Sequence, residues 1–587
     1  MATTISLDIL KTASSGEASG AYGTNSTIEA PDALAEIFGG RPGRSGDSPS
    51  VYLETFGCQM NVLDSQLVTG QLRALGYRFV DNWQSADVIL YNTCSVREVA
   101  ENKVWSRIGK YGKHKKTQAA EGNDSETVLG VIGCMAERDG EDMMRRYPQV
   151  DLLCGPGELD KVPMLIDNVM RTRIAKLDDD FDSLDERTRG PQVALQGNTH
   201  RRSGTLAAAE DQLELVDLTR SFAPDESLSG GKSAYVRITR GCNKLCTYCV
   251  VPHTRGAEVH RPPQHIVDEC KKLVDQGIIE ITLLGQTVNH YHYDAAAAVT
   301  VNGVLQPQVG TVISPNQGTG GPSPVFNDTT TSFAQLLHRI HEEIPGLQRL
   351  RFVTNFPRDF GNDILEVIRD SPRICRYLHL PVQSGSNRML KLMNRGYRIA
   401  DYMDLIQRVR EYLPDAELAT DIICGFPTET EEDHQATADL LRRCRFKNSF
   451  IFKYSPRPGT AAIHRFDDDV PQDVKKRRNN ELLAIQSEVS TAIHKGYVGK
   501  SVSVFVEKVS SKSKKNANTA DSSVSLGWQN PLSYTQLSGR TDGDLIVMFD
   551  VPSDHAMSLI GQMVEVEITD AAPLALFGRP VGSGSLV

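Results

Sequence analysis

The chain has 587 residues, 40% of them hydrophobic and 24% charged, proportions that fit a globular protein and exclude a largely disordered one. Lys and Arg total 64 against 74 Asp and Glu, so the net charge is -10. This charge gives no indication of nucleic-acid binding, but it does not exclude a local basic patch. The absence of any run of 18 apolar residues predicts no membrane contact, and an odd count of 11 cysteines argues against a disulfide framework; we expect a cytoplasmic protein.

The first predicted folded unit follows a tail. Residues 1–48 are rich in Ser, Gly, Ala and Thr, a composition typical of disorder. Between residues 49 and 170, short apolar runs alternate with helical patterns. The predicted strands are "VYLETF", "DVILYN", "TVLGVI" and "VDLLCG". This alternation predicts a parallel α/β sheet.

A second α/β unit is expected over residues 231–470, after an acidic, irregular stretch at 171–230 that we interpret as a linker. Its six strand candidates are "AYVRIT", "IIEITLL", "RLRFVT", "YLHLPV", "ELATDIICG" and "SFIFKY". Six units of this kind predict a partial (β/α)6 barrel. The stretch 295–330 is rich in Gly, Pro and Asn, which predicts a disordered insertion.

The last part of the chain has a different pattern. A connecting helix is expected at 471–496. Residues 497–587 then contain short β-type runs such as "KSVSVFVEKV" and "QMVEVEITDA". Their spacing predicts a small, five-stranded, OB-like all-β barrel.

Three cysteines, Cys242, Cys246 and Cys249, lie within eight residues just after the first strand of the predicted partial barrel. Three thiolates in one short loop fit three corners of a [4Fe–4S] cluster and leave the fourth iron open. The alternative is a zinc site with His253 as fourth ligand, but this spacing is uncommon for zinc. The motif resembles that of the radical S-adenosylmethionine (SAM) superfamily, whose open iron binds SAM.

Three further cysteines, Cys58, Cys94 and Cys134, each follow a predicted strand of the first sheet. The carboxyl ends of parallel strands meet at one edge, so these thiols should converge there. Gly57 and Gly133 would allow tight turns or a close approach beside them. The set predicts a second three-cysteine [4Fe–4S] cluster, with buried structural cysteines as the alternative.

Several longer motifs resemble the tRNA methylthiotransferase family. They include "FGCQMNVLDSQ", "NTCSVREVAENKV", "GCNKLCTYCVVPHTRG", "LHLPVQSGSNRML" and "YSPRPGTAA". The most similar subgroup modifies N6-isopentenyladenosine next to the anticodon. The resemblance implies three domains, with the N-terminal domain carrying the auxiliary cluster and a C-terminal TRAM domain binding RNA.

The resemblance also implies a reaction. SAM on the first cluster would yield a 5′-deoxyadenosyl radical that takes the hydrogen from C2 of adenine, and the auxiliary cluster would present the sulfur, methylated by a second SAM. A tRNA substrate, an electron-donor protein and a monomeric state are expected. The alternatives are the same chemistry on threonylcarbamoyladenosine or on a ribosomal-protein aspartate and, as another class, a non-catalytic iron-sulfur RNA-binding sensor.

Further residues follow from the matching motifs. By the same resemblance, SAM or substrate contacts are expected from Tyr248, Gln286, Gln383, Ser384 and Asp421, although satisfied barrel-interior polar groups are the alternative. Arg255, in "PHTRG", would meet a phosphate or carboxylate, or form a structural ion pair. RNA contacts in the TRAM domain are expected from Arg540, Arg579 and Lys500.

Overall fold

The computed structural model describes residues 48–95, 98–121, 127–177, 192–195, 214, 216–217, 231–301, 303–310, 329–510 and 534–581. The predicted tail, apart from Ser48, lies outside these ranges. Among the described helices, none combines the length and the apolar character that a bilayer crossing requires.

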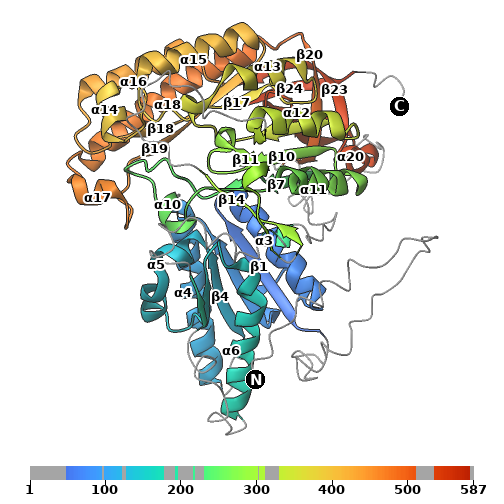
Figure 1. Ribbon diagram of the computed structural model, residues 1–587, viewed down its shortest axis with the longest axis vertical. Helices are drawn as coiled ribbons and strands as arrows, with labels where there is room; N and C mark the ends of the chain where they lie inside the picture. Colours follow the sequence, from blue (N-terminus) through green and yellow to red (C-terminus); the bar gives the residue numbers. More distant parts are fainter. Residues whose placement is uncertain are drawn as a thin grey trace, which may run out of the picture. The chain divides into compact units, whose positions relative to one another are not determined.

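The N-terminal part is a six-stranded, wholly parallel sheet in the order β2-β1-β3-β4-β5-β6 (Figure 1). All residues of β3 and β4 are buried, as expected for parallel strands that are covered on both faces. The strands are β1 (Ser50–Phe56), β2 (Arg78–Phe79), β3 (Val88–Thr93), β4 (Val128–Gly133), β5 (Leu152–Cys154) and β6 (Gln192–Ala194). The helices are α3 (Gln59–Ala74), α4 (Glu98–Ala120), α5 (Cys134–Arg146) and α6 (Val162–Leu177).

The central part contains all six predicted barrel strands. They form two parallel sheets, β16-β10-β7 and β17-β18-β19, and Leu350 of β16 forms an isolated parallel bridge with Ile374, in the segment before β17. The strands are β7 (Ser233–Arg237), β10 (Glu280–Leu284), β16 (Arg349–Phe352), β17 (Tyr377–His379), β18 (Glu417–Cys424) and β19 (Asn448–Lys453). The larger helices are α11 (Pro263–Asp275), α12 (Phe333–Glu343), α13 (Asn362–Asp370), α15 (Ile399–Tyr412) and α16 (Glu431–Cys444). The partial barrel is therefore confirmed, and one continuous apolar core fills it.

The predicted linker at 171–230 is not only a linker. Helix α6 extends to Leu177 and β6 adds an edge strand to the N-terminal sheet. Two carboxylates of the same stretch are buried in the central part: Glu214 bonds Arg261 at 2.9 Å, and Asp217 pairs with Arg237. The acidic composition of this stretch was the reason to interpret it as a linker. In the structure, ion pairs with buried arginines hold these two carboxylates in place.

The stretch 295–330 also differs from the predicted disordered insertion, in the part that the structure describes. Residues 295–310 contain a short 3-10 turn, the hairpin β12 (Thr300–Val301) to β13 (Val304–Leu305), and β14 (Gln308–Val309). Strand β14 pairs antiparallel with β9 (Val259–His260), which a composition-based prediction could not see. Residues 311–328 of the predicted insertion lie outside the described ranges.

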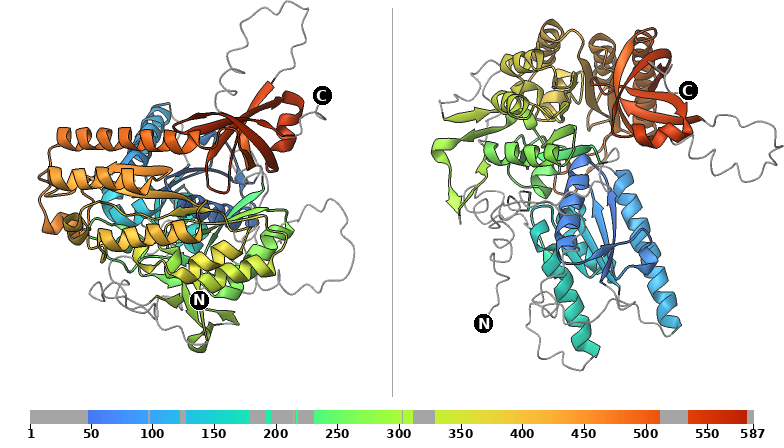
Figure 2. Two further views of the ribbon diagram at one scale, coloured as in Figure 1. Left: turned by 90° about the horizontal axis from the view of Figure 1, so that it is seen from above. Right: turned by 90° about the vertical axis from the view of Figure 1, so that its right-hand side faces the viewer.

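The C-terminal part begins with helix α18 (Gln472–Lys495) and ends in a closed five-stranded barrel, β20-β21-β22-β24-β23, drawn in red in Figure 2. Its interior is apolar, and the predicted small all-β barrel is confirmed. Arg351 of β16 donates to the carbonyl of Thr541 at 2.6 Å, so buried guanidinium groups join this barrel to the central one. The strands are β20 (Ser501–Val509), β21 (Tyr534–Arg540), β22 (Ile546–Pro552), β23 (Met563–Ala572) and β24 (Ala575–Pro580).

Candidate functional site

The carboxyl edge of the N-terminal sheet brings Cys58, Cys94 and Cys134 together. They follow β1, β3 and β4, which are neighbours in register: Phe56 lies opposite Thr93, and Thr93 opposite Gly133. From β1 the chain adds β2 on one side and then β3 on the other, so the order of strands reverses between β1 and β3. At such switch points a parallel sheet opens a crevice for ligands. The predicted convergence of these three cysteines is what the strand order produces.

Two glycines let the chain pack tightly at this edge. Gly57 has φ of +127° and a Cβ on it would collide with the Cβ of Cys94. Gly133 has φ of +93°, and a Cβ there would lie 2.9 Å from the carbonyl oxygen of Thr93. Both positions thus require glycine, and at Gly57 this allows the backbone before Cys58 to approach Cys94 closely.

A buried cation lies beside these thiols. Arg255, at the end of the short helix α10 (Val251–Thr254), donates to Asp64 of α3 at 2.6 Å, and both side chains are almost fully buried. The sequence left two roles open for Arg255, binding a phosphate or carboxylate and forming a structural ion pair, and in the structure it forms the ion pair. A hydrogen bond from Cys94, helped by the charge of Arg255, lowers the pKa of Cys58 to about 6, whereas burial raises the pKa of Cys134.

Arg255→Ala is expected to lower the free energy of unfolding of the full chain by about 3–5 kcal/mol, because Asp64 would stay buried without its cation. Urea unfolding under anaerobic conditions measures this. The double variant Arg255→Ala/Asp64→Ala should recover part of the loss. Arg369→Ala, which breaks an exposed pair with Asp370, serves as the control and should change little; an equal loss in both single variants would refute the assignment.

The second trio, Cys242, Cys246 and Cys249, lies in the loop between β8 (Thr239–Arg240) and α10; β8 itself follows the first barrel strand, β7. The amide of Cys249 donates to the carbonyl of Cys246 at 3.0 Å, and that of Cys242 to Gly256 at 3.2 Å. Burial raises the pKa of Cys242 well above its ordinary value and that of Cys249 to about 12, with mutual repulsion of the thiolates adding to it. These two cysteines are therefore thiols near pH 7, and a bound metal cluster would favour the thiolate form that acts as its ligand.

Gly241 fixes the start of this loop. Its φ is +68°, and a Cβ would collide with the carbonyl oxygen of Ala257. Gly241→Ala is therefore expected to reduce the iron bound by the loop at least twofold, measured as iron per chain after anaerobic reconstitution. Gly76→Ala is the matched control, because Gly76 has φ of +83° but nothing within 4 Å of its Cβ. Loss of iron in both variants to the same degree would mean that steric closure at Gly241 is unimportant.

Arg395 is a site residue that the sequence analysis missed. Its guanidinium lies 3.4 Å from the sulfur of Cys246 and 3.3 Å from the hydroxyl of Tyr248, and it donates to the carbonyl of Pro381 at 2.6 Å. The side chain comes from the loop after α14 (Asn387–Leu392), 149 residues from Cys246. No local spacing in the sequence could have connected them.

The residues predicted to contact SAM or substrate fall into two groups. Tyr248, Gln286 and Asp421 are partly exposed, and Asp421 Oδ1 lies 3.3 Å from His379 Nε2. Gln383 and Ser384 are buried; Gln383 has φ of +78°, and the hydroxyl of Ser384 lies 3.3 Å from that of Thr437. For Ser384 the structure therefore favours the satisfied barrel-interior interpretation.

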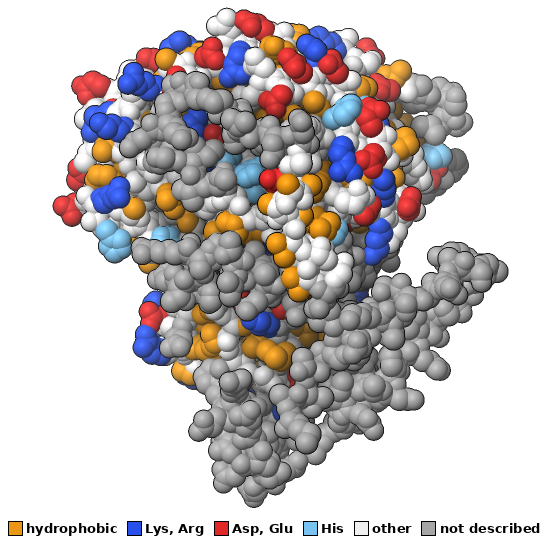
Figure 3. Space-filling model, viewed as in Figure 1, with side chains coloured by type: hydrophobic (Ala, Val, Ile, Leu, Met, Phe, Trp, Pro, Cys, Tyr) orange, Lys and Arg blue, Asp and Glu red, His pale blue; other side chains and the backbone are white. Residues whose placement is uncertain are grey.

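The three residues predicted to bind RNA differ in availability. Arg540 pairs with Glu507 at 3.1 Å and with Asp544 at 3.0 Å. Arg579 and Lys500 are exposed, with Lys500 Nζ 5.2 Å from the ring centre of Tyr497. Acidic and basic side chains are interspersed over the described surface in Figure 3, so a basic stripe is not evident on that face.

Two family models match parts of the chain. The family model described as the radical SAM superfamily matches residues 236–441, and the one described as uncharacterized protein family UPF0004 matches residues 50–155. A solved radical S-adenosylmethionine methyltransferase from Kitasatospora setae is similar at a TM-score of 0.44 and 16% identity, covering 71% of this chain and 74% of its own.

Two relatives are much more similar. A tRNA-2-methylthio-N(6)-dimethylallyladenosine synthase of Rhodopirellula baltica is 41% identical over 532 residues, 90% of this chain and 95% of the relative. The synthase of the same name from Bacteroides thetaiotaomicron is 35% identical over 535 residues, 91% of this chain and 97% of the relative. With this identity over nearly the whole length, the chain belongs to the family of tRNA-2-methylthio-N(6)-dimethylallyladenosine synthases.

Proposed function

We propose that the protein replaces the hydrogen on C2 of N6-isopentenyladenosine (N6-dimethylallyladenosine), next to the anticodon of tRNA, with a methylthio group. The observation that carries this is the near full-length match to synthases named for that product. The two separate three-cysteine sets, each at the carboxyl ends of parallel strands, support it, because sulfur insertion at an unactivated carbon needs a radical source and a sulfur source.

The residues fit two [4Fe–4S] clusters. Cys58, Cys94 and Cys134 would hold the auxiliary one at an edge where Gly57 permits close packing and Arg255 supplies positive charge. Cys242, Cys246 and Cys249 would hold the other. When bound, such clusters supply the electron that cleaves SAM and the sulfur that is inserted.

The chain's own side chains position these groups. Arg395 holds Cys246 and Tyr248 by hydrogen bonds and is itself anchored to the backbone of Pro381. Tyr248, within the cysteine loop, packs against a buried apolar cluster that includes Met389 and Phe426, which helps to hold the loop in place. Gln286, at the end of β10, and Asp421, on β18, are the polar groups that we assign to SAM or substrate.

For partners we propose a tRNA, held partly by Arg579 and Lys500, and an electron-donor protein. We further propose a monomer that works in the cytoplasm. Arg540 would contribute to RNA binding only while remaining paired with Glu507 and Asp544, so its effect should be smaller than that of Arg579.

Nucleoside mass analysis of tRNA tests the function. Cells that lack the gene should lose 2-methylthio-N6-isopentenyladenosine and accumulate N6-isopentenyladenosine. Loss of a methylthio derivative of threonylcarbamoyladenosine, or of methylthio-aspartate in a ribosomal protein, would instead assign a different acceptor. Reduced, reconstituted protein that releases no 5′-deoxyadenosine from SAM would favour a non-catalytic iron-sulfur sensor.

A further inference from the structure

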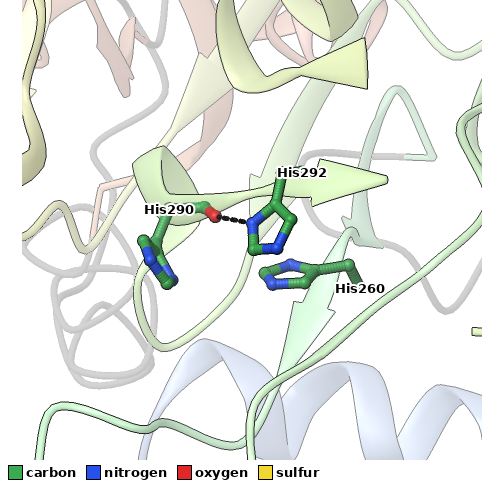
Figure 4. A group of neighbouring side chains, drawn as sticks. All are labelled: His260, His290 and His292. Carbon is green, nitrogen blue, oxygen red and sulfur yellow. Dashed lines mark hydrogen bonds between the residues drawn. The ribbon is translucent and has the colours of Figure 1, made fainter. Parts of the chain in front are cut away.

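Three histidines that belong to neither group of cysteines gather in the central domain. His260 ends β9, His290 ends the 3-10 turn Val288–His290, and His292 begins β11 (His292–Asp294). Figure 4 shows their rings turned toward one another. One nitrogen from each ring lies within 4.8 Å of the others, and it is the only such grouping of His, Cys, Asp or Glu found among the described residues.

Ring nitrogens of two of these histidines, His260 and His290, have no hydrogen-bond partner. His260 is fully buried, yet neither of its ring nitrogens has a hydrogen-bond partner. His290 is 5% exposed, and its Nε2 likewise has no hydrogen-bond partner. A buried polar nitrogen without a partner is destabilising, and two such residues side by side point to a ligand that would satisfy both.

The remaining contacts orient the rings. Nδ1 of His290 lies 2.6 Å from Oε1 of Glu258, and Nδ1 of His292 lies 3.0 Å from the carbonyl oxygen of His290. A carbonyl oxygen only accepts, so Nδ1 of His292 carries the proton and Nε2 carries the lone pair. A metal-binding histidine commonly donates its other N–H to a carboxylate or a backbone carbonyl, and two of these three rings already have that partner.

We propose that His260, His290 and His292 bind one zinc ion, with Glu258 orienting His290 and balancing part of the charge. Three neutral imidazoles are a known zinc ligand set that leaves a fourth position for water. Burial lowers the pKa of His260 well below its ordinary value, so this ring is neutral near pH 7, the form that coordinates a metal.

The position of this group indicates a structural role for the ion. His260 belongs to β9, which pairs with both β8 and β14. Strand β8 ends at Arg240, two residues before Cys242, and Glu258 also lies 3.4 Å from the amide of Asn243. Zinc at these histidines would therefore tie the base of the Cys242–Cys249 loop to the segment that follows β10.

The test uses the full chain with both iron-sulfur clusters reconstituted anaerobically, so that the cysteines are occupied. After zinc loading and gel filtration, elemental analysis should give about one zinc per chain. X-ray absorption at the zinc edge should show nitrogen or oxygen ligands at about 2.0 Å and no sulfur at about 2.3 Å. Zinc bound through sulfur, or no retained zinc, would overturn the proposal.

Matched variants locate the ion. His260→Gln and His292→Gln should each lose at least 90% of the retained zinc, whereas His338→Gln, at an exposed position of α12, should keep it. Glu258→Gln should weaken zinc affinity about 10- to 100-fold. Iron per chain is measured in every variant to show that each is folded. Because His292 is only partly buried, its replacement should disturb folding least. Retention of zinc by His292→Gln with normal iron would contradict the site.

Discussion

Replacing Cys242, Cys246 and Cys249 together by alanine is expected to lower the iron content from about eight to about four atoms per chain, as removal of one of two four-iron clusters requires. Formation of 5′-deoxyadenosine from SAM should fall below detection, because the radical source is lost. Iron and sulfide analysis after anaerobic reconstitution, with chromatography of the SAM products, measures both effects.

A matched control is available in the same domain. Cys270 and Cys444 are buried in the apolar core of the partial barrel, and Cys270→Ala/Cys444→Ala should keep about eight irons. Full iron in the triple variant would contradict the ligand assignment. Loss of all iron from it would mean instead that the two clusters do not assemble independently.

Replacing Cys58, Cys94 and Cys134 by alanine should separate the two halves of the reaction. The loop at Cys242–Cys249 remains intact, so SAM should still be cleaved to 5′-deoxyadenosine. Methylthio product should fall below detection, because no cysteines remain there to hold the sulfur-supplying cluster. Mass analysis of a tRNA substrate together with quantification of 5′-deoxyadenosine in the same reaction gives both readouts.

Comparing the two triple variants separates the roles of the two proposed clusters. Methylthio product from the Cys58/Cys94/Cys134 variant would remove the auxiliary role from the N-terminal domain. Failure of that variant to cleave SAM, with its second cluster present by iron count, would show that the edge of the N-terminal sheet is also needed to complete the SAM site.

Local patterns in the sequence were sufficient for most of the fold. Strands such as β3 and β4 are short apolar runs between helices, and the rule that parallel strands end at one edge placed Cys58, Cys94 and Cys134 together. Strand β6 was missed because three residues, Gln192–Ala194, in an acidic context carry no periodic signal; pairing with β5 defines it.

The parts of the site that depend on distant contacts were not predictable. Arg395 reaches Cys246 across 149 residues, and the ring nitrogens of His260 meet those of His290 only because β9 and the segment after β10 are neighbours. For Ser384 the sequence left two alternatives open, ligand contact and a satisfied interior group, and the hydroxyl of Thr437 within hydrogen-bonding distance favours the second. The position of a residue in a motif predicts that it lies near a site, but its role there depends on its hydrogen-bond partners, which only the structure shows.

The pairing of Asp64 with Arg255 also constrains how the protein is made. The two residues are 191 positions apart, so at 5–20 residues per second the ribosome needs roughly 10 to 40 seconds between them. During that interval the carboxylate of Asp64 has no guanidinium beside it, and burying it alone would be costly. The N-terminal sheet can therefore bury this carboxylate at low cost only after the segment that carries Arg255 has been synthesised.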